Sequence, residues 1–223
     1  MQIPARFNGP PGSGNGGWSA GAFAAAAGAR VGGPAFQVTL RRPPPLGTEL
    51  GLTGGRVLAG ADLVAEVAEL SAAEQPDVVV PPVELSGAVA AARAYPGLTG
   101  HPFPRCYVCG PDRAEGDGLR IFPGRLPDGR TAAPWTVPAG ATTETVWAAL
   151  DCPGGWTVLG EGRVFVLGRM AAAVAVLPAP GATCVVVAAA SGVAGRKATV
   201  DSALYAPGGA VLATAHATWI AVG

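Results

Sequence analysis

The feature that most constrains this chain is an ordered set of signals that occurs twice. Gly16-Gly17-Trp18 opens an Ala-rich segment in the first half, and Gly154-Gly155-Trp156 lies in the second. Two further pairs of segments keep the same order: strand patterns broken by prolines (36–48 and 173–182) and short apolar stretches (57–63 and 192–198). Equivalent points are about 135–138 residues apart, which indicates two copies of one structural unit.

Each half has the pattern of one helix followed by antiparallel strands. In the second half we expect a helix over residues 143–160. Apolar and β-branched content predicts strands after it at residues 163–177, 184–190, 197–205 and 210–221. Pro207-Gly208 predicts a hairpin turn between the last two strands. A helix followed by a strand meander favours an α+β fold with the helix on one sheet face.

The halves are separated by a Pro- and Gly-rich segment. We expect an N-terminal half over residues 1–85, a linker over 86–118 and a C-terminal half over 119–223. Val78-Val79-Val80 is a candidate edge strand of the first half, and residues 87–94 are a candidate linker helix.

Charge and hydropathy exclude several classes of function. The chain has 15 basic and 15 acidic residues, so no excess positive charge favours nucleic acid. No segment reaches the roughly 18–20 unbroken apolar residues of a membrane span. No signal-peptide pattern opens the chain, so we expect a cytoplasmic protein with reduced cysteines. Scarce lysine, with Lys197 alone, and abundant Ala, Gly and Pro indicate a GC-rich bacterial genome.

Three segments resemble a known family. They are residues 7–17, which end in the Gly-rich run to Gly17, residues 150–155 with the sequence Leu-Asp-Cys-Pro-Gly-Gly, and the closing strand at residues 212–217. Together with the order of helix and strands, they resemble the hotdog superfamily of acyl-CoA thioesterases in its double-hotdog form. The resemblance implies two tandem hotdog folds, each with a helix packed on a curved antiparallel sheet.

The resemblance also implies a hydrolase site at the junction of the two halves. Asp151 occupies the position of the family's base, which activates a water. Amides at the first helix start, around Asn15, Gly16, Gly17 and Trp18, would then bind the thioester carbonyl. The implied substrate is an acyl-CoA or another acyl thioester, with no cofactor and no metal.

Candidate substrate-binding residues lie around this site. Trp18 and Trp156 follow the two Gly-Gly pairs, and arginines such as Arg41, Arg42 and Arg169 could hold the phosphates of coenzyme A. His216, in the last predicted strand, is either a site residue or a hydrogen-bonded core histidine.

The neighbours of Asp151 give an independent reason to single it out. Its flanking residues are mostly apolar, so the carboxyl should be partly desolvated, with a raised pKa that suits a general base. The alternative is a helix cap, because Asp before Pro153 can cap a helix and Pro suits its first turn.

The run from Gly12 to Gly17 formally satisfies the dinucleotide motif G-x-G-x-x-G. That interpretation needs a buried strand before the run and an acidic residue after the next strand, and neither is present. The glycines instead let the backbone approach a ligand at a helix start, or form a flexible loop.

Cys106 and Cys109 form a single C-x-x-C, with His101 nearby. A structural zinc site needs four ligands, and Cys152 and Cys184 have the pattern of core residues. We therefore expect a structural turn here and no bound metal.

Two other functions remain open. The first is a hotdog protein that binds an acyl or hydrophobic ligand without turnover. The second is a hotdog hydratase or dehydratase, which needs an Asp–His pair, although neither His101 nor His216 lies in a recognisable hydratase motif. A monomer and a homodimer are both compatible with two units in one chain.

Overall fold

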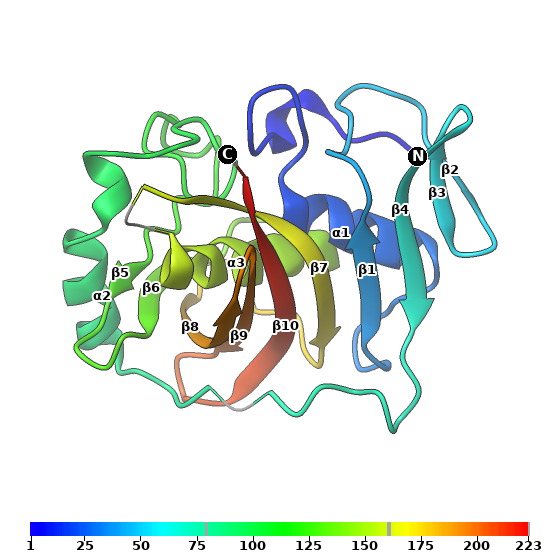
Figure 1. The fold of residues 1–223 in the computed structure, drawn as a ribbon. Coiled ribbons are helices and arrows are strands. Elements are labelled where there is room, and N and C mark those ends of the chain that lie inside the picture. The colour runs from blue at the N-terminus through cyan, green and yellow to red at the C-terminus, as the bar shows by residue number, and fades with distance from the viewer. Residues whose placement is uncertain (79, 160–161, 223) are drawn as a thin grey trace.

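The computed structural model describes residues 1–78, 80–159 and 162–222. One antiparallel sheet of ten strands dominates it, in the order β2-β3-β4-β1-β7-β10-β9-β8-β6-β5 (Figure 1). The strands are β1 Phe36–Leu40, β2 Gly51–Thr53, β3 Arg56–Ala59, β4 Asp62–Glu69, β5 Gly124–Arg125, β6 Thr131–Thr136, β7 Val164–Val174, β8 Thr183–Ala194, β9 Lys197–Tyr205 and β10 Val211–Val222.

Two helices lie side by side on one face of this sheet. Helix α1, Gly16–Ala26, covers β1 and the neighbouring part of β4 and β7, and α3, Thr143–Val158, covers the strands from β7 to β6. The sheet–helix core contains large, fully buried side chains such as Phe23, Leu150 and Met170. This layered α+β arrangement confirms the expected fold class.

The strand order is the same on both sides of the central β1–β7 pair. From β1 outward the strands run β4, β3, β2, and from β7 outward they run β10, β9, β8, with β6 and β5 beyond. Helix α1 precedes β1 along the chain as α3 precedes β7. The repeat inferred from the sequence therefore has a counterpart in strand order.

Two of the matched sequence signals are nevertheless not equivalent in space. Gly16 and Gly17 begin α1, whereas Gly154 and Gly155 lie inside α3. A Cβ on Gly155 would be 2.5 Å from the Trp219 ring, so this second glycine pair lets the helix pack closely on the sheet. Segment 57–63 covers the turn between β3 and β4, and segment 192–198 covers the turn between β8 and β9. By their places in the sheet, however, β3 and β4 correspond to β9 and β10, so these two segments are not equivalent.

The segment between the halves packs on the second half. Helix α2, Leu85–Arg93, confirms the expected linker helix and contacts β5 and β6. The expected edge strand is wrong, since Val78 and Val80 lie in no strand and Val79 is outside the described residues. Val80 is buried, and its carbonyl accepts a hydrogen bond from Tyr205 at the end of β9. None of the helices in the described ranges has the length and apolar character that crossing a bilayer needs.

Helices α1 and α3 run antiparallel and approach closely at two glycines. A Cβ on Gly17 would lie 2.4 Å from the Asp151 Cβ, and one on Gly21 would lie 2.8 Å from the Glu144 Cα. Neither distance is compatible with a side chain. Glycine at both positions therefore sets the helix separation and brings the start of α1 against the middle of α3.

We predict that Gly21→Ala lowers the free energy of unfolding by about 1–3 kcal/mol, because the added methyl overpacks the helix crossing. The matched control is Gly87→Ala in α2, whose added Cβ meets only the Val83 Cγ1 methyl, at 3.2 Å. That change should leave stability unchanged or raise it by up to about 1 kcal/mol, through helix propensity. Denaturant unfolding of both variants checks this, and a stable Gly21→Ala would contradict the close crossing.

Candidate functional site

A groove of about 430 Å³ opens beside the crossing of the two helices. Its walls come from segments far apart in sequence: the start of α1, the middle of α3, the end of β1, the first part of β7 and the loop around residues 101–109. The volume lies in the usual range for small-molecule sites, roughly 300–1,000 Å³. Of the predicted site residues, Asn15, Gly16, Asp151 and Trp156 line it.

Asp151 lies in the middle of α3, and its carboxylate meets the first turn of α1. The Gly17 amide donates to Oδ2 at 2.9 Å, and Asn15 Nδ2 donates to the same oxygen at 3.2 Å. The other oxygen, Oδ1, is buried and has no hydrogen-bond partner within the described part of the chain. The alternative in which Asp151 caps its own helix is wrong, because Asp151 lies in the interior of α3 and its carboxylate accepts a hydrogen bond from the first turn of α1.

The electrostatics of Asp151 follow from this placement. Only 3 % of the residue is exposed, and burial raises the pKa of its carboxyl to about 7. The hydrogen bonds from Gly17 and Asn15 stabilise the charged form and hold the pKa lower than burial alone would leave it. The direction of this pKa shift is the one that the apolar neighbours of Asp151 predicted.

The amides at the start of α1 differ in what they contact. Gly17 N donates to Asp151, and Trp18 N donates to Asn15 Oδ1 at 2.8 Å, which is an N-cap bond. The Gly16 amide has no hydrogen-bond partner among the residues the structure describes. The Gly17 and Trp18 amides, which were expected to bind the thioester carbonyl, therefore have protein partners, and the Gly16 amide is the one left to bind a ligand.

The two tryptophans have different surroundings. Trp156 is buried at the groove wall and packs edge-on against Tyr95, with ring centroids 4.7 Å apart. Trp18 stacks on Phe7, with centroids 3.9 Å apart, and does not line the groove. Of these two tryptophans, Trp156 is therefore the one that can contact a ligand in the groove.

The sheet carries two other predicted residues on its opposite face. Arg169 is exposed and donates to Thr39 Oγ1 at 3.1 Å. His216 Nδ1 lies 2.6 Å from Asp201 Oδ1 across β9 and β10, while its neighbours Ala215 and Ala217 are buried. Because side chains alternate along a strand, His216 points away from α3 and the groove, and the expectation that it reaches the site is wrong.

Two arginines expected to contact phosphate do line the groove. Arg41 and Arg42 follow β1 at the open end. Each is about half exposed and pairs with an acid on β4: Arg41 Nε donates to Glu66 Oε2 at 2.7 Å, and Arg42 Nη1 is 2.8 Å from Asp62 Oδ1.

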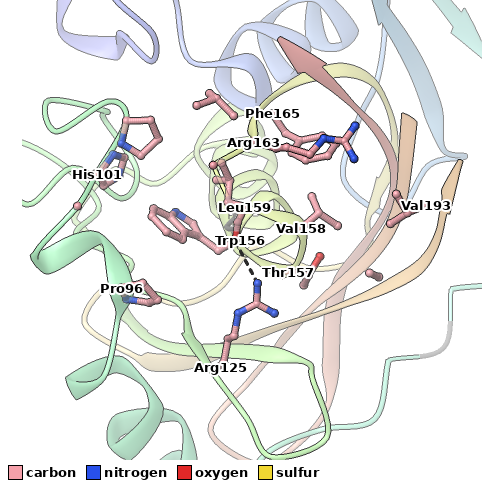
Figure 2. A pocket seen from close by; sticks show the side chains of 15 residues that line it. Pro96, His101, Arg125, Trp156, Thr157, Val158, Leu159, Arg163, Phe165 and Val193 are labelled. Carbon is pink, nitrogen blue, oxygen red and sulfur yellow. Dashed lines mark hydrogen bonds between the residues drawn. The ribbon is translucent and has the colours of Figure 1, made fainter. Parts of the chain in front are cut away.

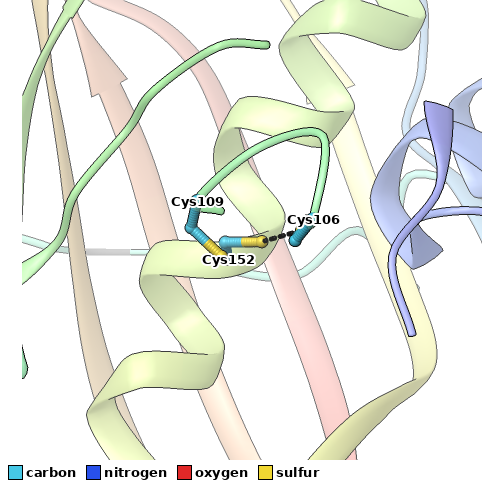
Figure 3. A group of neighbouring side chains, drawn as sticks. All are labelled: Cys106, Cys109 and Cys152. Carbon is cyan, nitrogen blue, oxygen red and sulfur yellow. Dashed lines mark hydrogen bonds between the residues drawn. The ribbon is translucent and has the colours of Figure 1, made fainter. Parts of the chain in front are cut away.

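Three thiols meet beside Asp151 (Figure 3). Cys106 and Cys109, from the loop, and Cys152, from α3, have sulfurs that all lie within 4.8 Å of one another. Hydrogen bonds from Cys109 and Cys152 lower the pKa of the Cys106 thiol, whereas burial raises the pKa of Cys109. Cys152, which the sequence pattern assigned to the core alone, is therefore a third thiol beside the C-x-x-C.

A second, more open groove of about 930 Å³ adjoins the first (Figure 2). The two grooves share a wall that includes His101, Trp156 and Phe165. Arg125 and Arg163 line only the second, and Arg125 Nη2 donates to the Leu159 carbonyl at 3.0 Å. The two grooves are therefore neighbours on the surface of the protein, with these side chains between them.

Comparison with known proteins identifies the fold. No protein-family model matches the sequence, and no curated protein matches it. Among solved structures, a hotdog-fold protein of unknown function from Alicyclobacillus acidocaldarius superposes with a TM-score of 0.63 at 14 % identity, over 100 % of this chain and 92 % of that one. This chain therefore has the hotdog fold.

Of two further similar structures, one is described as a proposed thioesterase. A proposed thioesterase from Novosphingobium aromaticivorans has a TM-score of 0.61 at 16 % identity, covering 100 % of this chain and 94 % of the other. The tesB protein of Mycobacterium avium subs paratuberculosis has a TM-score of 0.59 at 12 % identity, covering 100 % and 91 %. Identities this low establish a shared fold.

His216 and Asp201 give a pH-dependent prediction. The hydrogen bond to Asp201 raises the pKa of His216 above its ordinary value of 6.5. A raised folded-state pKa means that protonation stabilises the fold. The contribution is complete below about pH 6.5 and is lost as the pH rises through the folded-state pKa.

We therefore expect His216→Gln to cost more stability at about pH 5.5 than at about pH 9. Because the His216 side chain is 41 % exposed, the difference should stay within the roughly 0.2–1 kcal/mol of exposed ion pairs. Denaturant unfolding at both pH values measures it, and an equal cost at both would show that the pair is neutral.

Proposed function

We propose that this chain is a thioester hydrolase built as two tandem hotdog units, with one composite site in the groove between α1 and α3. The observation that carries the proposal is the buried Asp151 carboxylate, with one oxygen bonded to the start of α1 and the other without a protein partner. A buried polar atom left unpaired is rare in folded proteins and needs an explanation. A water or substrate group bound to Oδ1 provides one.

In this proposal Asp151 Oδ1 accepts a hydrogen bond from the attacking water and takes up its proton as the water adds to the thioester carbonyl. The Gly16 amide, at the positive end of the α1 dipole, donates to the oxygen that becomes negatively charged. Collapse of the tetrahedral intermediate breaks the carbon–sulfur bond, and Asp151 returns its proton to the leaving sulfur, so that a carboxylic acid and a thiol are released.

The groove also suggests how a coenzyme A thioester is oriented. Arg41 and Arg42 lie at the open end and could exchange their acidic partners for phosphates. Trp156, Phe165 and Trp219 give the groove an apolar wall, which suits an acyl group. Acyl-CoA is therefore the proposed substrate class, with the nucleotide near the arginines and the acyl group along Trp156.

The hydratase alternative is less consistent with this geometry. His101 and Asp151 line the same groove, but both ring nitrogens of His101 are engaged. Nε2 is 3.2 Å from Cys109 Sγ, and Nδ1 accepts from the Phe103 amide at 2.8 Å. A histidine held in this way has no free nitrogen for an acid–base partnership with Asp151.

A binding protein without turnover is the remaining alternative, since the bond from the Gly17 amide to Asp151 Oδ2 also suits a purely structural role for this carboxylate. It predicts that acyl-CoA binds but is not cleaved. Turnover by the wild-type protein on a panel of acyl-CoAs, measured as thiol release, decides between the two.

We predict that Asp151→Asn lowers kcat by about 10²–10⁴-fold, because the amide cannot accept the proton from water. An asparagine oxygen can still accept from the Gly17 amide, so the free energy of unfolding should change by no more than about 1 kcal/mol. Initial rates and denaturant unfolding measure the two effects.

The matched control for this change is Asp201→Asn, an aspartate in β9 on the sheet face opposite the groove. It should leave kcat unaltered. Wild-type turnover by Asp151→Asn would reduce Asp151 to a structural cap of α1 and end the proposed mechanism.

We predict that replacing Arg41 and Arg42 together with alanine raises KM for an acyl-CoA by about 10–100-fold with little change in kcat, because uniform binding is lost. The effect should vanish for the matching acyl-pantetheine thioester, which lacks the nucleotide phosphates. Arg169→Ala, an exposed arginine on the opposite face, is the control. An equal rise in KM for both substrates would show that the arginines shape the groove and do not bind phosphate.

A further inference from the structure

The three thiols beside Asp151 have a geometry that the hydrolase proposal does not use. The Sγ atoms of Cys106 and Cys152 are 3.8 Å apart, and Cys109 completes a triangle whose sides are all within 4.8 Å. In a tetrahedral zinc–thiolate site, with Zn–S near 2.3 Å, two sulfurs are separated by about 3.8 Å. The observed spacing thus fits one cation held between the sulfurs.

The segments that carry the thiols also fit a metal site. Cys106 and Cys109 have the C-x-x-C spacing typical of zinc-binding loops, and the Cys106 amide lies in a turn closed by Phe103 O at 2.8 Å. Cys152 comes from a rigid helix 43 residues further along than Cys109. All three are nearly fully buried, at 3 %, 3 % and 6 % exposure.

Two side chains point N–H donors at these sulfurs. Asn15 Nδ2 is 3.8 Å from the sulfurs of both Cys106 and Cys152. His101 Nδ1 accepts from the Phe103 amide, which leaves the proton on Nε2, directed at Cys109 Sγ at 3.2 Å. Donors of this kind stabilise thiolates and orient metal ligands.

We propose that Cys106, Cys109 and Cys152 bind one thiophilic divalent cation of the zinc class through three thiolates. His101 and Asn15 act as hydrogen-bond donors to the ligating sulfurs. Each thiol loses its proton on binding, and the fourth coordination position faces the groove, because all three cysteines line it. The cation fixes the residue 101–109 loop to α3 next to Asp151.

The first test is metal content. Protein without a histidine tag, purified under phosphine reductant, should contain about one zinc per chain by mass spectrometry. Apo-protein titrated with Co²⁺ should develop thiolate-to-metal charge-transfer absorption and the visible bands of tetrahedral cobalt. Cys106→Ser, Cys109→Ser and Cys152→Ser should each lose the metal, whereas Cys184→Ser, a buried thiol in β8, should keep it.

A wild-type measurement covers the case in which the serine variants do not fold. Zinc at about 100 times its Kd should raise the stability of the chain by about 2.7 kcal/mol, seen as a higher Tm that a chelator reverses.

His101→Ala should weaken zinc binding by about 10–100-fold while keeping the cobalt spectrum, as expected of a donor to the ligands. A changed cobalt spectrum would overturn the role given to His101.

The metal-site proposal would be wrong if the protein contained no stoichiometric metal, showed no cobalt charge-transfer absorption and had a Tm that did not depend on zinc. A Cys106–Cys152 disulfide found by peptide mapping of the native protein would also overturn it. None of these readouts depends on thioester hydrolysis, so the metal site and the proposed function can fail separately.

Discussion

The hydrogen bond from the Gly17 amide to the Asp151 carboxylate is the contact on which the rest of the site depends. It forms because α1 begins at Gly16, where Asn15 caps the helix and directs the first amides toward α3. It also needs glycine at position 17, since any side chain there would overlap Asp151. The helix crossing, the cap and the buried charge are therefore parts of one arrangement.

Helix α3 is held in place around Asp151 by side chains from the sheet. The Ser202 hydroxyl donates to the Leu150 carbonyl at 2.9 Å, and the Thr131 hydroxyl donates to the Pro153 carbonyl at 2.7 Å. Proline inside a helix removes one backbone hydrogen bond, and these anchors help α3 to continue through Pro153. The carboxylate is consequently fixed by both its own helix and the sheet beneath it.

Burying a carboxylate costs free energy unless its charge is matched. In Asp151 this charge is only partly stabilised. Oδ2 accepts hydrogen bonds from two donors at the positive end of α1, whereas Oδ1 has no donor in the described structure. The same Asn15 side chain contacts Asp151 and two of the clustered sulfurs. The base of the proposed hydrolase and the proposed metal site therefore share one polar residue, and the fold places both in one groove.

The sequence by itself determined several of the elements, because their signals are local. Hydrophobic pattern and turn residues predicted strand β9 at its observed bounds, 197–205, and the helix around residues 143–160. The order of these elements indicated the hotdog fold. The apolar neighbours of Asp151 predicted the direction of its pKa shift, although the burial that raises the pKa comes from the packing of the folded site.

Only the tertiary structure decided which residues share the site. The face to which Arg169 and His216 point depends on strand register, and β10 has a register shift between Thr218 and Trp219 that no local pattern marks. The meeting of Cys152 with Cys106, and of Asp151 with Gly17, joins segments 46 and 134 residues apart. Such distances are set by the packing of helices on a sheet, which is a property of the whole chain and not of any one segment.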